Sequence, residues 1–204
     1  MKHFEYTLPS GYKQAKVIDA GSKKLGIILN LIALLVTAII VGATVLILKP
    51  QNIMEDMTLD AKYFLRLAIY FVILFGYIVL HELVHGAAYK LLTKQKLKFG
   101  MTLTVAYCGV PDIFVYRKAA LIALLAPFTV FLPLFAAPIF LLAADVDKIF
   151  CAFMLGMHIG GCSGDLYISF LYAVKFKDPS VLMQDTGPKQ IFYVKETAQK
   201  QDSL

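Results

Sequence analysis

The sequence predicts an all-α membrane protein with four transmembrane helices and a short β-hairpin on the cytoplasmic side between helices 2 and 3. Hydrophobic residues make up 59% of the 204 residues, charged residues only 17%, and the mean hydropathy is +0.70, unlike an ordinary soluble domain. Four apolar segments each exceed the ~20 residues that cross about 30 Å of hydrocarbon. The length leaves room for one compact unit, so we expect residues 1–204 to form a single membrane-embedded domain.

The four apolar segments are the expected transmembrane helices, with approximate bounds 25–48, 63–92, 119–143 and 149–174. Of the 20 basic residues, 16 fall in the N-terminal tail, in the C-terminal tail, or in the connection between the second and third segments together with Lys90 at the end of the second segment. Because cytoplasmic segments carry an excess of Lys and Arg, both termini are predicted to be cytoplasmic. The net charge of +6 reflects this bias, since the basic residues flank apolar runs, and no nucleic-acid partner is expected.

The connection between the second and third segments predicts the hairpin. Apolar and polar residues alternate along residues 96–105 (KLKFGMTLTV), as in a strand with one apolar face. Residues 108–112 resemble a turn, and residues 113–116 could return as a second strand. Two interpretations stay open: a hairpin that rests on the bundle, or an edge to which a substrate adds as a further strand.

The third segment contains Pro127, Pro133 and Pro138. Proline removes a helical hydrogen bond and tends to kink the helix, and neighbouring groups must then satisfy the freed carbonyl oxygens. Simple bending is the favoured interpretation, and opening of a lateral gate is the alternative.

Ionisable residues stand inside the second apolar segment, in the stretch YIVLHELVHGAAYK. His81, Glu82 and His85 form the pattern HExxH, and on a helix the two histidines lie one turn apart on the same face, where both can bind one zinc ion. Glu82 is rotated by about 100° from His81, so it can reach a water molecule at the metal without being a ligand. Ionisable groups are costly to place in hydrocarbon, so those found there usually have a function. The pattern therefore predicts a catalytic zinc site with Glu82 as general base.

A third protein ligand is needed, since catalytic zinc usually has three. Asp165 is the only carboxylate in the fourth segment, and at about 1.5 Å per residue its depth agrees with that of His81 to within a turn. Gly156, Gly160 and Gly164 recur along one helix face and predict close helix packing there. His158 is the competing ligand or an outer-shell partner, but it should lie about 10 Å nearer the outer surface than Asp165.

The three cysteines, Cys108, Cys151 and Cys162, do not predict a metal site of their own. They are odd in number and have no CxxC spacing, so neither a disulfide framework nor a cysteine zinc site is indicated. We interpret them as small packed side chains.

The HExxH helix, the later aspartate and the strand-rich connection resemble the site-2 protease class of intramembrane zinc metalloproteases. The N-terminal FEYTLPSGYKQAKVID, the HELVHG and the SGD are similar, more specifically, to a bacterial family of zincin peptidases. The resemblance implies a bacterial cell membrane, with His81, His85 and Asp165 as zinc ligands and Glu82 as the base. One departure is that Leu166 follows Asp165, where site-2 proteases typically have an Asp-Gly pair.

These observations predict zinc-dependent hydrolysis of peptide bonds within the membrane or at its edge. We expect the substrate to be a membrane protein with a single span, surrounded by the same lipid bilayer. Two alternatives stay open: a non-catalytic membrane adaptor with structural zinc or none, and a zinc hydrolase of a lipid-like substrate.

Overall fold

Three long helices form where the sequence is continuously apolar. The computed structural model describes residues 2–51, 53 and 58–196 and contains α1 (Lys23–Leu48), α3 (Ala61–Thr93) and α4 (Arg117–Ala136), which α5 (Pro138–Leu141) extends. Each is long and apolar enough to cross a membrane. Their apolar side chains are mostly exposed, as expected where lipid is the solvent. The chain is therefore a membrane protein.

The predicted fourth helix is interrupted. The segment consists of α6 (Asp145–Gly161) and α7 (Ser163–Val174), which meet at Cys162 and are bent by 44°. Four continuous spans were therefore a wrong prediction: in the described part of the chain three helices qualify singly, and the bent pair qualifies only when taken together. The glycines that flank the bend have low helix propensity, which favours a break at this point.

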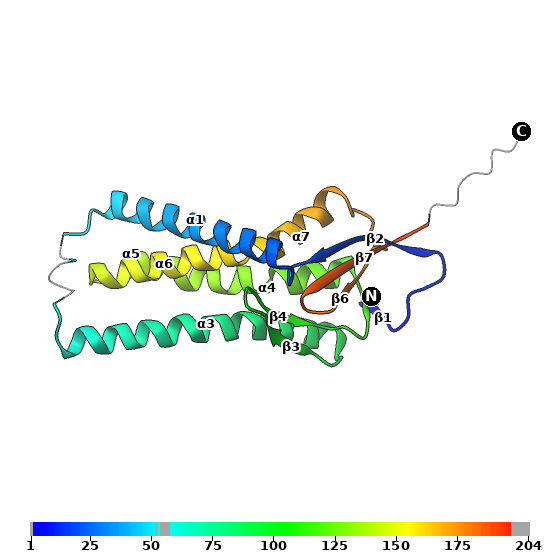
Figure 1. Ribbon diagram of the computed structural model, residues 1–204, viewed down its shortest axis with the longest axis horizontal. Coiled ribbons are helices and arrows are strands. Elements are labelled where there is room, and N and C mark those ends of the chain that lie inside the picture. Colours follow the sequence, from blue (N-terminus) through cyan, green and yellow to red (C-terminus); the bar gives the residue numbers. More distant parts are fainter. Residues whose placement is uncertain (1, 52, 54–57, 197–204) are drawn as a thin grey trace, which may run out of the picture.

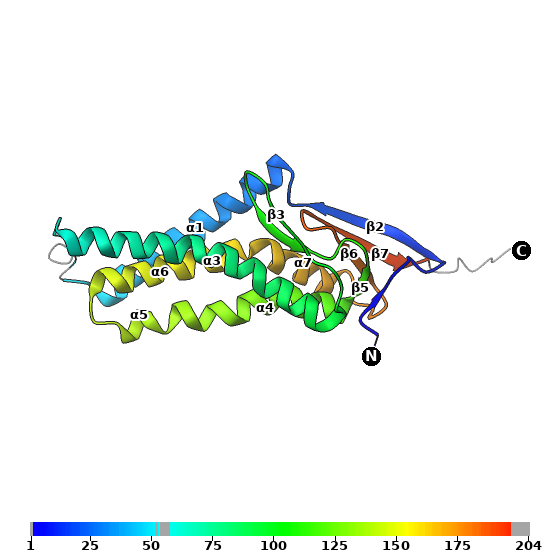
Figure 2. The same ribbon diagram turned by 90° about the horizontal axis from the view of Figure 1, so that it is seen from below.

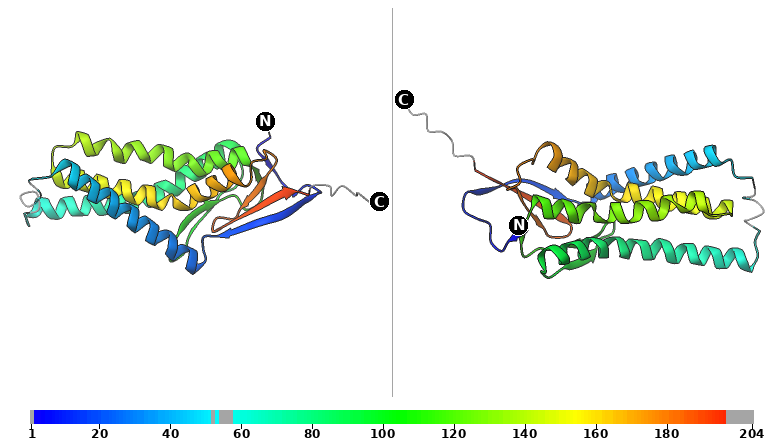
Figure 3. Two further views of the ribbon diagram at one scale, coloured as in Figure 1. Left: turned by 90° about the horizontal axis from the view of Figure 1, so that it is seen from above. Right: turned by 180° about the vertical axis from the view of Figure 1, so that it is seen from behind.

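The all-α prediction was also wrong, because an antiparallel sheet closes one end of the bundle (Figure 1). Its strand order is β1-β5-β6-β7-β2. The strands are β1 (Phe4–Glu5), β5 (Phe114–Tyr116), β6 (Leu182–Asp185), β7 (Lys189–Lys195) and β2 (Tyr12–Asp19). The sheet thus joins both ends of the described chain to the connection between α3 and α4, with β2 and β7 as a long slanting pair (Figure 3).

The predicted hairpin is present, but its second strand is a different segment. β3 (Lys98–Met101) pairs with β4 (Ala106–Gly109), and residues 113–116 belong to the larger sheet instead. The turn comes early because Thr102 closes it: its N–H donates to Val105 O at 2.8 Å, and its Oγ1 accepts from Val105 N–H at 3.1 Å. The hairpin lies beside α3 and reaches the beginning of α1 (Figure 2).

Two packing regions fix the positions of α3, α6 and α7. The sheet packs on the nearby ends of α3, α4 and α7 through a buried core that includes Tyr89, Ile113, Ala120, Tyr172, Met183 and Phe192. In the bundle, Gly156 and Gly160 of α6 pack so closely on α1 that an added methyl group would overlap the backbone of Thr37 and Ala33. The beginning of α7, which follows α6, therefore lies at a fixed place between the bundle and the sheet.

Candidate metal centre

His81 and His85 lie on the inward face of α3, as their spacing predicts. Both are buried, with 9% and 7% of their surface exposed. The neighbouring Leu80 and Leu83 point outward and are half exposed, so the motif lies on a helix that presents apolar side chains to its surroundings. At 3.6 residues per turn, residues four positions apart share a face, whereas residues one or two positions away point in other directions. The two histidines therefore face inward while the leucines between and beside them face outward.

Asp165 completes a group of donors with these histidines. It lies in the first turn of α7, directly after the bend. Its Oδ2 is 3.7 Å from His81 Nε2 and 3.4 Å from His85 Nε2, and the three donor atoms all lie within 4.8 Å of one another. The structure thus brings together three of the residues singled out in the sequence, from two helices far apart along the chain.

The donor set fits zinc. Two imidazole nitrogens and one carboxylate oxygen are ligands that catalytic zinc accepts, and with metal-to-ligand distances near 2.1 Å, tetrahedral ligands are separated by about 3.4 Å. The measured distances from Asp165 Oδ2 to the two histidine nitrogens, 3.4 and 3.7 Å, are close to that value. These residues could therefore hold a zinc ion with little rearrangement.

A backbone carbonyl sets the orientation of His85. The ring Nδ1 lies 2.8 Å from Ala123 O on α4, and because a carbonyl only accepts hydrogen bonds, Nδ1 must carry the proton. The neutral ring then has its lone pair on Nε2, which is the atom that faces Asp165. Histidines that bind zinc commonly donate their other ring N–H to a carbonyl or carboxylate oxygen in this way.

The sequence analysis missed the residue that contacts His81. Tyr77 precedes it by four residues on the same face of α3, and its hydroxyl lies 3.2 Å from His81 Nδ1. The same hydroxyl lies 2.9 Å from His158 Nδ1 on α6. The spacing of four was visible in the sequence, but tyrosine on an apolar helix gives no signal by itself.

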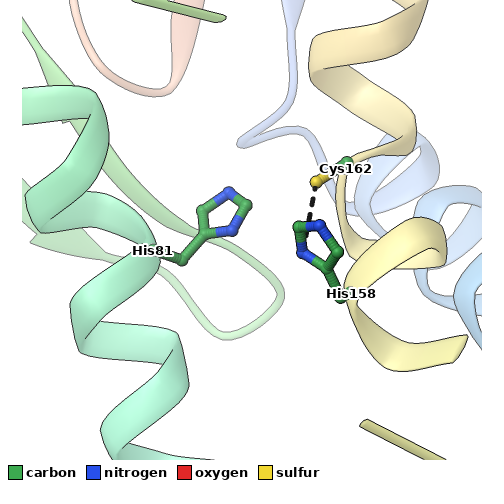
Figure 4. Close-up of side chains that lie close together, drawn as sticks. All are labelled: His81, His158 and Cys162. Carbon is green, nitrogen blue, oxygen red and sulfur yellow. Dashed lines mark hydrogen bonds between the residues drawn. The ribbon is translucent and has the colours of Figure 1, made fainter. Parts of the chain in front are cut away.

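His158 lies closer to the site than its expected depth suggested. Its ring centroid is 6.3 Å from that of His81, and the Tyr77 hydroxyl lies between the Nδ1 atoms of the two rings. It is not part of the group with Asp165, but His81, His158 and Cys162 form a second group of donor atoms within 4.8 Å of one another. Figure 4 shows His81 on one side and His158 with Cys162 on the other, where Cys162 Sγ lies 3.7 Å from His158 Nδ1.

Glu82 lines a cavity of about 380 Å³ that opens beside the histidines. The walls come from α1, α3, the β3–β4 hairpin, the α6–α7 bend and the turn between β6 and β7. One residue from each of these five walls, in the same order, is Asn30, Glu82, Tyr107, Asp165 and Gly187. Glu82 is half-buried, and the group of donor atoms around Asp165 consists of His81, His85 and Asp165 itself. The Glu82 carboxylate is therefore available for proton transfer.

The apolar helices and this donor set define a membrane protein with a zincin-type site. Residues 74–179, more than half of the chain, match the family described as "Putative zincin peptidase", and the chain belongs to this family. The matched residues contain the HExxH motif and Asp165. Membership implies zinc-dependent peptide hydrolysis. No curated protein and no solved structure matches the chain.

Proposed function

We propose that this protein is an intramembrane zinc peptidase of the site-2 protease type, with His81, His85 and Asp165 as ligands. The observation that carries the proposal is the approach of one Asp165 oxygen to the Nε2 atoms of both HExxH histidines, at 3.7 and 3.4 Å. Zinc bound there supplies Lewis acidity, which polarises a carbonyl oxygen and acidifies water. An aspartate ligand also reduces the net charge of the site to +1, which is easier to hold in an apolar surrounding.

Glu82 is proposed as the general base. It follows His81 directly, so its side chain is turned away from the ligand direction and into the cavity. Its carboxylate accepts the proton of the attacking water and later donates it to the leaving amine. A structural zinc site would not require a carboxylate at this position, which favours an enzyme over a non-catalytic adaptor.

The hairpin is proposed to hold the substrate in an extended conformation. A helical substrate hides its carbonyl groups in its own hydrogen bonds, so it must unwind before attack. β4 lines the cavity with Ala106, Tyr107 and Cys108, and in the described part of the chain it pairs only with β3. Toward Gly109 the other edge is covered by the turn between β6 and β7, since Val110 N–H donates to Asp185 O at 2.9 Å. The part of this edge at Ala106 can accept a substrate strand beside Glu82. This replaces the edge of residues 96–105 that the sequence suggested.

Exposed apolar side chains around the motif support cleavage within the membrane or at its edge. Val79, Leu80 and Leu83 of α3 are 60%, 51% and 47% exposed on the face opposite the histidines. Water exposure of such a row would be unfavourable, whereas lipid contact is not. A membrane protein with a single span is the substrate class that reaches such a site through the bilayer.

Trapping with Glu82→Gln tests the proposal. The variant keeps the three ligands, so it should bind zinc like the wild type while peptide hydrolysis falls by at least about 100-fold. Single-span membrane proteins should accumulate with it, and His81→Ala, which lacks a ligand, serves as the metal-free control. Undiminished turnover in Glu82→Gln would contradict the role of Glu82, and enrichment of lipids instead of proteins would favour a lipid-like substrate.

A further inference from the structure

A chain of hydrogen bonds links His81 to the carbonyl oxygen of Phe128 through Tyr77 and His158. His158 Nε2 lies 3.3 Å from Phe128 O, its Nδ1 lies 2.9 Å from the Tyr77 hydroxyl, and this hydroxyl lies 3.2 Å from His81 Nδ1. The chain connects three helices, α4, α6 and α3. The proposed function assigns no role to Tyr77 or to His158.

The carbonyl at one end determines the direction of every hydrogen bond. Phe128 O can only accept, so His158 Nε2 carries a proton. His158 is fully buried, and no described carboxylate hydrogen-bonds to it, so the ring is neutral and its Nδ1 has a lone pair. Nδ1 therefore accepts the proton of the Tyr77 hydroxyl.

The same reasoning continues to His81. A tyrosine hydroxyl has one proton, and Tyr77 already donates it to His158. Toward His81 the Tyr77 oxygen is thus an acceptor, and His81 Nδ1 must be the donor. The neutral ring of His81 then has its lone pair on Nε2, the atom that lies 3.7 Å from Asp165 Oδ2.

We propose that Tyr77 and His158 are positioning residues that fix the tautomer and orientation of His81, so that its unprotonated Nε2 faces the metal. The inference rests on the proposed function, because it concerns the same metal site. In this arrangement the Tyr77 hydroxyl accepts from His81 Nδ1–H, just as the Ala123 carbonyl accepts from His85 Nδ1–H. It also explains why a histidine and a tyrosine are buried together in an apolar helix bundle, among Phe131 and Phe135.

The second group of donor atoms, His81, His158 and Cys162, offers a competing explanation (Figure 4). If a metal were held there, Cys162 would be a ligand. In the chain of hydrogen bonds from Phe128 O to His81, here called the relay, the Tyr77 hydroxyl is the hydrogen-bond partner of both Nδ1 atoms. Cys162 Sγ makes only a long contact of 3.7 Å to His158 Nδ1. The two explanations therefore differ in what Cys162 does.

Zinc affinity of Tyr77→Phe gives the first test. The substitution keeps the ring, which packs edge-on against Phe131 and Phe135 at centroid distances of 5.2 and 5.3 Å, and removes only the hydroxyl. Competition with a chelator should show zinc bound about 10- to 100-fold more weakly, the usual loss for an outer-shell partner. Tyr70→Phe, two turns earlier on α3 and bonded to Asp147 instead, is the matched control and should bind zinc like the wild type.

Variants of His158 test whether the two residues act as one chain. His158→Leu should weaken zinc binding to a similar degree, and His158→Asn, which keeps an acceptor oxygen near the position of Nδ1, should lose less. In the Tyr77→Phe background, His158→Leu should cause almost no further loss, since the link to His81 is already broken. Additive losses would overturn the relay.

Spectroscopy separates the relay from cysteine ligation. Cobalt bound in place of zinc should show no thiolate charge-transfer absorption, and Cys162→Ala should keep its metal affinity; either opposite result would overturn the relay. In metal-free protein labelled with ¹⁵N-histidine, His81 should show a protonated Nδ1 in the wild type and a mixture of tautomers in Tyr77→Phe. If Asp165→Ala bound zinc as tightly as the wild type, the proposed site itself would fail. Normal affinity in Tyr77→Phe, with Asp165 still required, would overturn the relay alone.

Discussion

His85 donates its Nδ1–H to the backbone carbonyl of Ala123 at 2.8 Å, and this carbonyl is one that its own helix leaves free. In α4 the usual donor to Ala123 O would be the amide of the residue four positions later, which is Pro127 and has no N–H. The proline that the sequence suggested as a bend therefore has a second effect. It leaves an acceptor in the bundle at the place where the HExxH helix requires one.

Replacing this proline should strengthen the helix and weaken the metal site. Pro127→Ala restores an amide that competes with His85 for Ala123 O, so we expect zinc affinity to fall about two- to tenfold, less than for complete loss of an outer-shell partner. Thermal stability without metal should stay equal or rise, because proline inside a helix is unfavourable. Pro133→Ala, one and a half turns further, is the control. Equal zinc affinities in both variants and the wild type would contradict this role of Pro127.

Metal analysis of two variants tests which residue completes the site. Asp165→Ala should lose its zinc and reduce activity by more than about 100-fold, because the carboxylate oxygen lies within 3.7 Å of both histidine nitrogens. His158→Ala should still bind zinc, though more weakly, and retain part of its activity. Zinc retained in Asp165→Ala but absent from His158→Ala would reverse the assignment.

The sequence predicts those parts of the site that depend on local geometry. The facing of His81 and His85 follows from helical spacing, and the pairing of Asp165 with them follows from residue depth along two helices. The position of His158 does not, because it depends on side-chain contacts with Tyr77 and Phe128 on two other helices. The contact between Tyr77 of α3 and His158 of α6 depends on how the two helices are placed in space, which no spacing within one helix reveals.

The sheet was missed for a related reason. β7 contains the run IFYV, whose aromatic and β-branched residues are typical of strands, yet it lies in a polar tail and its partner β2 is at the opposite end of the chain. No local pattern indicates which distant segment a strand pairs with, so the pairing of β2 with β7 could not be read from either run alone. Overall composition, dominated by apolar helices, therefore predicted an all-α protein.

Reporter fusions test the membrane orientation. Gln51 and Asp145 lie at the same end of the bundle, where Gln51 N–H donates to Asp145 Oδ2 at 3.0 Å, and the sheet lies at the other end (Figure 1). Because 15 of the 19 basic residues in the described part of the chain lie toward the sheet, fusions after Gln51 and Asp145 should report outside, and fusions after Lys98 and Lys177 inside. Different signals from Gln51 and Asp145 would conflict with the structure, and a complete reversal would contradict the orientation.

The free edge of β4 can be tested without touching the metal ligands. Since Thr102 and Val105 form the hydrogen-bonded pair next to the turn, alternation along an antiparallel pair directs the N–H of Ala106 away from β3. Ala106→Pro removes this outward donor, and we expect a drop of about tenfold or more in cleavage of a helical membrane substrate with zinc content unchanged.

Tyr107→Pro is the matched control for this edge, because the N–H of Tyr107 points toward β3 and its loss should disturb the hairpin itself. The comparison uses hydrogen exchange of the hairpin amides together with turnover. If Ala106→Pro turned over the substrate at the normal rate with an intact hairpin, strand addition at β4 would be ruled out, and the metal assignment would stand.

Asp185 makes the junction between the sheet and α3 sensitive to pH. Its carboxyl is only 3% exposed, and burial raises its pKa to about 6, although it accepts hydrogen bonds from the Tyr89 hydroxyl and from Gly187 N–H, which act in the opposite direction. The folded protein thus binds this proton more tightly than the unfolded chain does. Its stabilising effect is fully present below about pH 4 and is lost as the pH rises through 6.

Asp185→Asn should remove that dependence, because the amide resembles the neutral acid: its oxygen can accept from Gly187 N–H and its NH₂ group can donate to the Tyr89 oxygen. We expect the variant to be more stable than the wild type by about 1–3 kcal/mol at pH 7.5, and this difference to shrink at pH 5, where the wild type gains its proton. Thermal unfolding in detergent at the two pH values measures it. Asp178→Asn is the control, because Ser180 N–H donates to this exposed carboxylate and lowers its pKa. Its substitution should therefore decrease, not increase, the stability at pH 7.5. A difference between Asp185→Asn and the wild type that stayed the same at both pH values would show that Asp185 is not the titrating group.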